Sequence, residues 1–183
     1  GFHGRVGIHE FLQVTPRLRD SLMRGASYDE LRDLAVEDGF REMRYDGLKK
    51  ALRAQEIARD NKLPMIHLVE SGGANLMYQA EIFVDGGRSF ANQARLSAAG
   101  IPQIAVVHGA STAGGAYLPG LSDYVVLVRE RSSIYLAGPP LVKAAIGEDA
   151  TDEQLGGAET HAELTGLGEY LCENDEHAIA LTR

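Results

Sequence analysis

After Pro64 the chain repeats one local order: a short apolar run, a glycine-rich turn, a helix and another apolar run. The first two runs are residues 65–69 (MIHLV) and 103–108 (QIAVVH), and each leads into a turn rich in glycine. Apolar runs of this length that alternate with helices are typical of buried strands in a layered α/β domain. The alternation therefore predicts an α/β fold with helices packed on the faces of a sheet.

Periodicity and helix-end signals predict the other elements of this region. Helical spacing of apolar or small residues predicts helices over residues 48–60, ended by Asn61, and over 87–99, ended by Gly100-Ile101-Pro102. Residues 124–128 (YVVLV) and 133–136 (SIYL) predict two strands joined by the polar turn 129–131. We expect short helices from Pro140 to the C-terminus.

The first 47 residues differ in composition and predict short helices. They contain seven Arg and no Lys, whereas all four Lys of the chain lie beyond them. Thr15 before Pro16 predicts a helix start, and Gly25 predicts its end. Ser27 and Glu30 form a capping-box pattern for a second helix, which Gly39 ends. We expect a helical appendage over residues 1–47 and a separate domain over 48–183.

Composition excludes several classes of protein. The chain has 183 residues and a formal net charge of -8, with 18 basic against 26 acidic residues, which argues against a nucleic-acid binder. Its one cysteine, Cys172, can form neither an internal disulfide nor a cysteine metal cluster, and we expect no metal. No apolar run approaches the roughly 20 residues of a membrane helix, and no secretory leader opens the chain. We therefore expect a cytoplasmic protein without membrane contact.

Two glycine clusters, each at the end of a predicted strand, are the best candidates for a site. They are Ser71-Gly72-Gly73-Ala74 and Ala113-Gly114-Gly115-Ala116, and Tyr117–Leu121 predicts a helix start directly after the second. Glycines let a ligand approach backbone N–H groups, and a helix start adds its dipole, which suits a phosphate or a developing oxyanion. The alternative interpretation is that both clusters are tight turns in which glycine only relieves crowding.

The side chains near these turns match known catalytic or metal-binding patterns only poorly. Ser111 with His108 could suggest a hydrolase, but Ala113 stands where the nucleophile-elbow pattern needs glycine. For His67 and His108 a role in the core or in supporting a site is favoured over catalysis or metal binding. Glu70 and Asp123 are the carboxylates nearest the turns, and a capping role is favoured over that of a base. The sequence has no P-loop motif.

Three long segments carry a resemblance to a known family: residues 52–76 (LRAQEIARDNKLPMIHLVESGGANL), 90–123 (FANQARLSAAGIPQIAVVHGASTAGGAYLPGLSD) and 134–148 (IYLAGPPLVKAAIGE). From about Leu48 to Arg183 the sequence resembles the N-terminal half of the carboxyltransferase (β) subunit of biotin-dependent acyl-CoA carboxylases, nearest to the methylcrotonyl-CoA and geranyl-CoA type. The resemblance implies a crotonase-like partial core of stacked ββα units that shape an acyl-CoA site.

The resemblance also implies roles for the glycine clusters. Gly72 and Gly73 match the family's oxyanion-stabilising pair, and Gly114 and Gly115 match the turn that lines the acyl-CoA pocket. The flanking residues implied to contact acyl-CoA are Ser71, Ala74, Ala113, Ala116 and Tyr117. In the implied reaction carboxybiotin releases CO2, and the freed biotin nitrogen takes the α or γ proton of the acyl-CoA. The resulting enolate attacks the CO2 while backbone donors hold its negative oxygen.

Residues 1–47 resemble another family, the C-terminal region of secretion or type IV pilus ATPases, so we expect a chimera joined near Asp46-Gly47. In the carboxylase family a second half supplies the biotin surface and a biotin carboxylase or carrier subunit is a partner, so this chain should be inactive alone. The alternative is a non-enzymatic recombined module that forms a homo-oligomer to cover its truncated core. A crotonase-type hydratase or hydrolase is a third, minor interpretation.

Overall fold

The computed structural model describes residues 7–73 and 79–183, and it divides into two compact units. The smaller unit ends at Ala54 and holds α1 (Pro16–Met23), α2 (Tyr28–Glu37) and the start of α3 (Met43–Asn61). The larger unit runs from Gln55 to Arg183. Within the described ranges, no helix is both long and apolar enough to span a bilayer.

The caps predicted for the first two helices are confirmed. Thr15 Oγ1 accepts a hydrogen bond from Leu18 N at 3.2 Å, and Ser27 Oγ accepts one from Glu30 N at 3.3 Å. The glycines that end these helices, Gly25 and Gly39, have φ of 74° and 98°, the left-handed conformation expected after a helix.

The third helix is longer than predicted. It begins at Met43 instead of Leu48, because Glu10 Oε2 accepts a hydrogen bond from Met43 N at 3.0 Å and so satisfies a helix N-terminal donor from a distant position. The helix is therefore continuous through Asp46-Gly47. The predicted junction between two segments of different origin stays a prediction. The structure has no change of secondary structure at this point.

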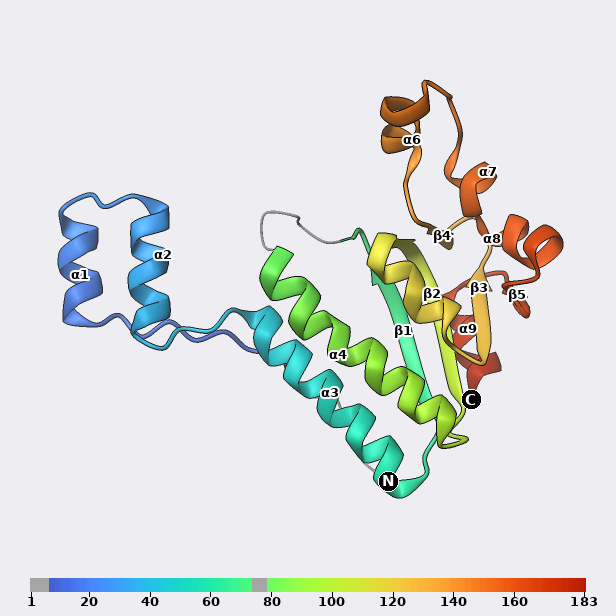
Figure 1. The fold of residues 1–183 in the computed structure, drawn as a ribbon, viewed down its shortest axis with the longest axis horizontal. Coiled ribbons are helices and arrows are strands. Elements are labelled where there is room, and N and C mark those ends of the chain that lie inside the picture. Colours follow the sequence, from blue (N-terminus) through green and yellow to red (C-terminus); the bar gives the residue numbers. More distant parts are fainter. Residues whose placement is uncertain (1–6, 74–78) are drawn as a thin grey trace. The chain divides into compact units, whose positions relative to one another are not determined.

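A parallel five-stranded sheet forms the centre of the larger unit (Figure 1), which confirms the predicted α/β class. The strand order is β1-β2-β3-β5, with β4 also paired to β2. The strands are β1 (Met65–Ser71), β2 (Gln103–Thr112), β3 (Tyr124–Val128), β4 (Ser133–Tyr135) and β5 (Tyr170–Cys172). The short helices predicted from Pro140 onward are confirmed, and the strand β5 lies among them. The sequence did not predict β5, because three residues are too short to show a period.

β2 organises the sheet because it pairs with three strands. Its residues 104–107 pair with β3 and its residues 110–112 pair with β4. Thus β3 and β4, which the sequence places in succession, align with different halves of one longer strand. The chain turns between them at Glu130, whose φ is 59°.

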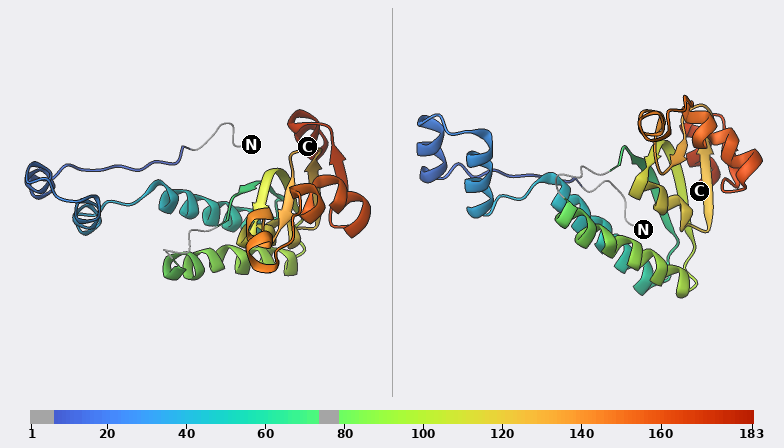
Figure 2. Two further views of the ribbon diagram at one scale, coloured as in Figure 1. Left: turned by 90° about the horizontal axis from the view of Figure 1, so that it is seen from above. Right: turned by 45° about the horizontal axis from the view of Figure 1, so that its top comes forward.

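Helices and short helical turns surround the sheet (Figures 1 and 2). The helix predicted to begin at Gly87 begins earlier, since α4 spans Gln79–Ala98. The others are η2 (Ala113–Ala116), α5 (Tyr117–Gly120), α6 (Pro139–Ile146), α7 (Asp152–Gly156), α8 (Ala158–Thr160), the π-helical turn η3 (His161–Thr165) and α9 (Asp175–Thr182).

The apolar core lies on both faces of the sheet. On one face Val107, Leu127 and Ile134 pack with Ala158 of α8 and with Leu118 of α5. On the other face Val106, Val126 and Cys172 pack against Ala178 of α9. A third cluster joins the end of α3 to α4 through Ala58, Leu96 and Ile101.

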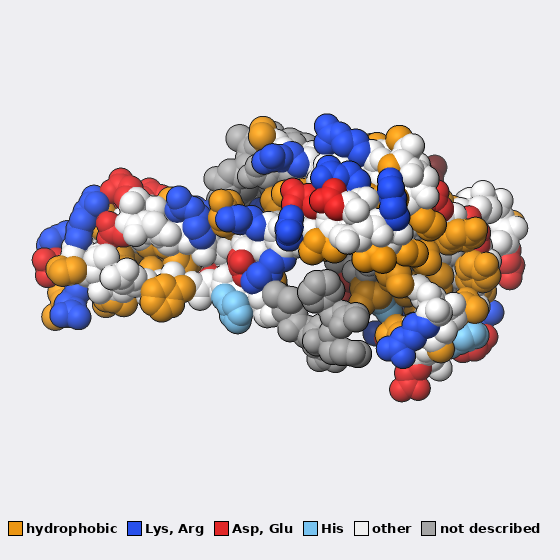
Figure 3. Space-filling model, turned by 90° about the horizontal axis from the view of Figure 1, so that it is seen from below, with side chains coloured by type: hydrophobic (Ala, Val, Ile, Leu, Met, Phe, Trp, Pro, Cys, Tyr) orange, Lys and Arg blue, Asp and Glu red, His pale blue; other side chains and the backbone are white. Residues whose placement is uncertain are grey.

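One part of the second face is uncovered. Ile66 pairs with Ile104 and Ile104 with Tyr124 in the parallel register, and the rings of Tyr124 and Tyr170 lie 6.5 Å apart. We call these residues together with Leu68 the apolar sheet face. Leu68 is 66% exposed, and Ile66, Tyr124 and Tyr170 are each more than 40% exposed. Figure 3 shows hydrophobic side chains gathered across the larger unit.

Candidate functional site

The two predicted glycine turns leave neighbouring parallel strands at the same edge of the sheet. Gly72 and Gly73 follow β1 directly, and Gly114 and Gly115 lie in η2, the turn that follows β2 (Figure 1). Because β1 and β2 are parallel and adjacent, their carboxyl ends bring the two turns together. Loops at this edge form the binding crevices of many α/β sheets.

The space around the glycines shows how close together the two turns lie. A Cβ built on Gly73 would lie 3.8 Å from Thr112 O and 3.9 Å from Ala113 Cβ. A Cβ on Gly115 would lie only 2.8 Å from both Cβ and Oγ of Ser71, so a larger residue at position 115 would collide with β1. The second turn can approach the first only because position 115 is glycine.

Two backbone conformations at the turns are uncommon. Gly73 has φ of 94°, and Ala113, which carries a Cβ, has φ of 53°. A non-glycine residue with positive φ stores strain, and such residues concentrate at functional sites. Gly72, Gly73 and Gly114 are exposed, so a ligand could reach this part of the backbone.

The flanking residues of the predicted site take different positions. Ala116 packs against the core, and the ring of Tyr117 lies 5.9 Å from the ring of Phe90 on α4 and is 55% exposed. Ser71 Oγ accepts a hydrogen bond from Gly73 N at 3.3 Å. The predicted contact residue Ala74 lies outside the described residues.

The histidine and serine candidates have structural partners. Ser111 is fully buried and its Oγ donates to Gly115 O at 2.9 Å, so the hydroxyl faces the second turn. His108 Nδ1 lies 2.8 Å from Asp175 Oδ1 on α9, a pairing that the sequence did not indicate. This hydrogen bond lowers the pKa of Asp175 below its usual value, and the charge of Arg131 lowers it further.

His67, Asp123 and Glu70, the other side chains considered from the sequence, lie close to neighbouring groups of the fold. Burial lowers the pKa of the His67 imidazole, and the nearby Gln103 side chain opposes this shift only in part. Asp123 Oδ2 accepts from Gln103 N at 2.8 Å, which agrees with the capping role that we favoured. The Glu70 side chain lies against Gly109, where a Cβ would approach Glu70 Oε1 to 2.8 Å.

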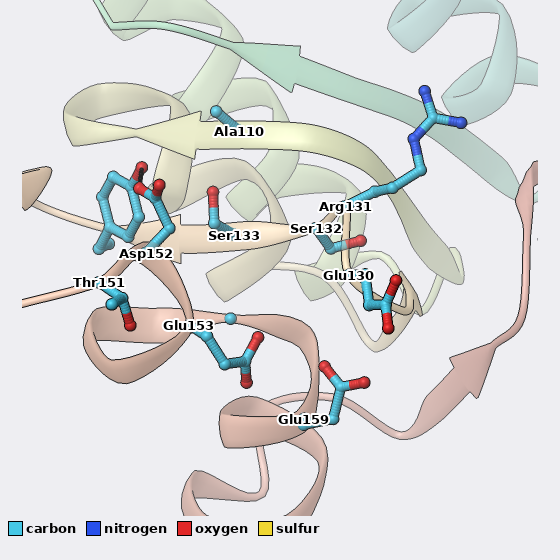
Figure 4. Close-up of a pocket in the computed structure, with 11 residues that line it drawn as sticks. Ala110, Glu130, Arg131, Ser132, Ser133, Thr151, Asp152, Glu153 and Glu159 are labelled. Carbon is cyan, nitrogen blue, oxygen red and sulfur yellow. Dashed lines mark hydrogen bonds between the residues drawn. The ribbon is translucent and has the colours of Figure 1, made fainter.

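A cavity of about 640 Å³ lies elsewhere in the larger unit, and the sequence did not predict it (Figure 4). The β3–β4 turn, β4, α7 and α8 form most of its wall. Its lining residues are Ala110, Glu130, Arg131, Ser132, Ser133, Tyr135, Thr151, Asp152, Glu153, Gly157 and Glu159.

Most carboxylates of this cavity are engaged in local structure. Asp152 accepts from Tyr135 Oη at 2.6 Å, Glu153 accepts from Thr160 N at 2.9 Å, and Glu159 pairs with Arg129 at 3.0 Å. These contacts hold α7 to β4 and to α8, and α8 to the turn that follows β3. Across the described ranges, no group of three or more His, Cys, Asp and Glu side chains is arranged to hold a metal ion.

The fold and the site together define an α/β protein with a parallel sheet and two glycine turns close together at the carboxyl edge of that sheet. The chain belongs to the carboxyl transferase domain family, whose model matches residues 42–183. This match and the structural neighbours show that the fold is the carboxyltransferase, crotonase-like fold.

Relatives of known sequence agree with this assignment. The chain is 59% identical over 136 residues to the probable biotin-dependent acyl-coenzyme A carboxylase beta2 subunit of Mycobacterium tuberculosis, covering 74% of this chain and 26% of the relative. It is 55% identical over 139 residues to the probable mitochondrial methylcrotonoyl-CoA carboxylase beta chain of Drosophila melanogaster, covering 74% of this chain and 24% of the relative.

Solved structures give the same result. The beta subunit of Pseudomonas aeruginosa geranyl-CoA carboxylase matches with a TM-score of 0.67 and 64% identity, over 75% of this chain and 26% of that subunit. Transcarboxylase 12S, solved as a hexamer assembly with methylmalonyl-coenzyme A bound, matches with a TM-score of 0.69 and 29% identity, over 75% of this chain and 26% of that one.

The chain thus spans about a quarter of the length of the relatives that it matches. The family match leaves residues 1–41 outside it, and none of these comparisons supports an ATPase-like segment there. The ATPase resemblance and the chimera stay predictions.

Proposed function

We propose that this chain is the acyl-CoA-binding part of a carboxyltransferase, of the methylcrotonyl-CoA or geranyl-CoA type, and that it is inactive alone. The observation that carries the proposal is the contact between the two glycine turns. Gly73 lies near Thr112 and Ala113, and Gly115 lies near Ser71, at one edge of the sheet. The names of the relatives, which are carboxylase β subunits for acyl-CoA substrates, support the same substrate class.

In the proposed reaction the main chain carries the chemistry. Backbone N–H groups at the turns donate to the thioester oxygen of the acyl-CoA, and they bind it more strongly as it gains negative charge in the enolate. One well-placed donor of this kind contributes about 3 kcal/mol to transition-state stabilisation. Ser71, Ala113, Ala116 and Tyr117 flank the turns and, with Ala74, would contact the acyl group.

Carboxyl transfer from carboxybiotin needs a biotin surface, and no residue of this chain is assigned to it. In the proposal another part of a longer protein or a second subunit supplies that surface, and a biotin carboxylase or carrier subunit is the partner. The chain's own contribution is to bind the acyl-CoA and to hold its thioester oxygen.

Binding of methylcrotonyl-CoA tests the proposal. A ligand that binds only the native state raises the melting temperature Tm, and at about a hundredfold excess over Kd the stabilisation is about 2.7 kcal/mol. We expect the wild-type chain to show this shift and the Gly73→Val variant to lose it, because a β-branched side chain would occupy the exposed turn.

Gly166→Val is the matched control for this experiment. Gly166 has φ of 72° and a Cβ there would meet no atom within 4 Å, so the variant carries a similar backbone strain away from the turns. Its Tm should fall, but its shift with methylcrotonyl-CoA should persist. No shift in the wild-type chain would contradict the proposed function.

The apolar sheet face favours a second candidate, a non-enzymatic module that forms a homo-oligomer. Exposed aliphatic and aromatic side chains on β1, β3 and β5 are unusual for a parallel sheet, whose faces are normally both covered. Self-association and acyl-CoA binding are compatible, and the absence of any ligand shift would leave the oligomeric module as the better interpretation.

A further inference from the structure

Two serines stand side by side where β1 and β2 end. Ser71 pairs with Ser111 as the last residues in register between these strands. Between this pair and the preceding pair, Val69 with Val107, β1 has one residue and β2 has three. The two additional residues of β2 are therefore what brings Ser111 opposite Ser71, at the level of both turns.

Both serines contact the second glycine turn. Ser111 is completely buried, and its Oγ donates to Gly115 O at 2.9 Å. Ser71 approaches Gly115 from the other strand and occupies the space that a Cβ would need, at 2.8 Å. Gly115 thus accepts a hydrogen bond from one serine, and the other serine leaves no room for a side chain at position 115.

Ser71 also contacts the first turn, since its Oγ accepts the hydrogen bond from Gly73 N. A chain of contacts therefore joins Ser111, Gly115, Ser71 and Gly73 across the two turns. Both hydroxyls form hydrogen bonds with backbone groups of the turns. His108, which was considered as a base for Ser111, has its Nδ1 paired with Asp175.

We propose that Ser71 and Ser111 are positioning residues, which set the two glycine turns relative to each other and so aim their backbone N–H groups at one acyl-CoA thioester oxygen. This inference rests on the proposed function. It assigns no bond-making step to either hydroxyl. A displacement of about 1 Å between donors is enough to weaken such a site severely, so the separation of the turns needs a fixed support.

A size exchange between positions 115 and 71 tests the contact. Gly115→Ala introduces a methyl group against Ser71, while Ser71→Gly removes both atoms that the methyl group would meet. In calorimetry on the full chain, we expect Gly115→Ala to weaken methylcrotonyl-CoA binding by about tenfold and binding of CoA itself by less than about twofold. The double variant should recover part of the lost affinity, because the space is restored.

The exposed Ser97 of α4 provides the control, and Ser97→Ala should bind both ligands as the wild type does. Equal affinity of the wild type and Gly115→Ala for methylcrotonyl-CoA would overturn the positioning role and leave the proposed function intact. A wild-type chain that does not bind methylcrotonyl-CoA would overturn the proposed function and, with it, the role of the pair.

A ligand-free measurement covers the case in which Gly115→Ala does not fold. In protein labelled with ¹⁵N-glycine, Ser111→Ala should move the amide resonances of Gly115 and also of Gly73, although Gly73 lies on the other turn. Ser97→Ala should move neither resonance. A Gly73 resonance that stays in place in Ser111→Ala would contradict the coupling between the turns, whatever the affinity for acyl-CoA.

Discussion

At the scale of single residues, burial of His67 makes the stability of the larger unit depend on pH. Its Nε2 is buried and, among the described residues, has no hydrogen-bond partner. Burial lowers the pKa of the imidazole, so the native state resists protonation, whereas the unfolded chain titrates near the ordinary value of 6.5. Below that pH the unfolded state binds more protons, and the free energy of unfolding must fall.

We expect urea unfolding to show a loss of stability from about pH 7 to pH 5.5, and His67→Gln should make this loss smaller. Identical slopes for the wild type and His67→Gln in this range would exclude His67 as the source.

At the scale of elements, α4 contains two glycines, Gly86 and Gly87, and the sequence suggested the second of them as the start of the helix. The helix instead runs through Gly86 and Gly87, and a Cβ at either position would meet no atom within 4 Å. Glycine in an exposed helix interior costs about 1 kcal/mol relative to alanine. Gly87→Ala should therefore raise the free energy of unfolding by about 1 kcal/mol, measured in urea.

The end of the same helix gives the opposite expectation. Gly100 follows α4 with φ of 70°, a conformation that favours glycine. Gly100→Ala should lower the free energy of unfolding by about 1 kcal/mol, although its Cβ would also meet no atom within 4 Å. If both variants shifted stability in the same direction, the assigned span of α4 would be wrong.

At the scale of the whole molecule, the apolar sheet face should decide the association state. Leu68 is 66% exposed beside Ile66 on β1, so a charge there would disfavour contact with another apolar surface. We expect the wild-type chain to self-associate in sedimentation velocity and Leu68→Glu to weaken this association by about tenfold or more.

Leu164→Glu is the matched control for association, because Leu164 is 81% exposed but lies in η3, outside the apolar sheet face. It should associate as the wild type does. A wild-type chain that stays monomeric over the accessible concentrations would contradict the expected homo-oligomer, and it would leave acyl-CoA binding untouched.

The sequence by itself determined the local features of this protein. The caps at Thr15 and Ser27, the strands that begin at Met65 and Tyr124, and the two glycine turns follow from hydrogen bonds and periodicities within a few residues. Such signals depend on neighbours along the chain and can be recognised without knowledge of the fold. The family resemblance over residues 48–183 also came from the sequence, and the match over 42–183 confirmed it.

Only the tertiary structure decided how these pieces meet. The pairing of β4 with β2, the hydrogen bond between His108 and Asp175, and the contact of Ser71 with Gly115 join residues far apart in the chain. These contacts depend on strand register and on two additional residues in β2, which no local pattern reveals. The sequence therefore predicted the candidate site only as two separate glycine turns. The pairing of the parallel strands β1 and β2 brings these turns together at one edge of the sheet.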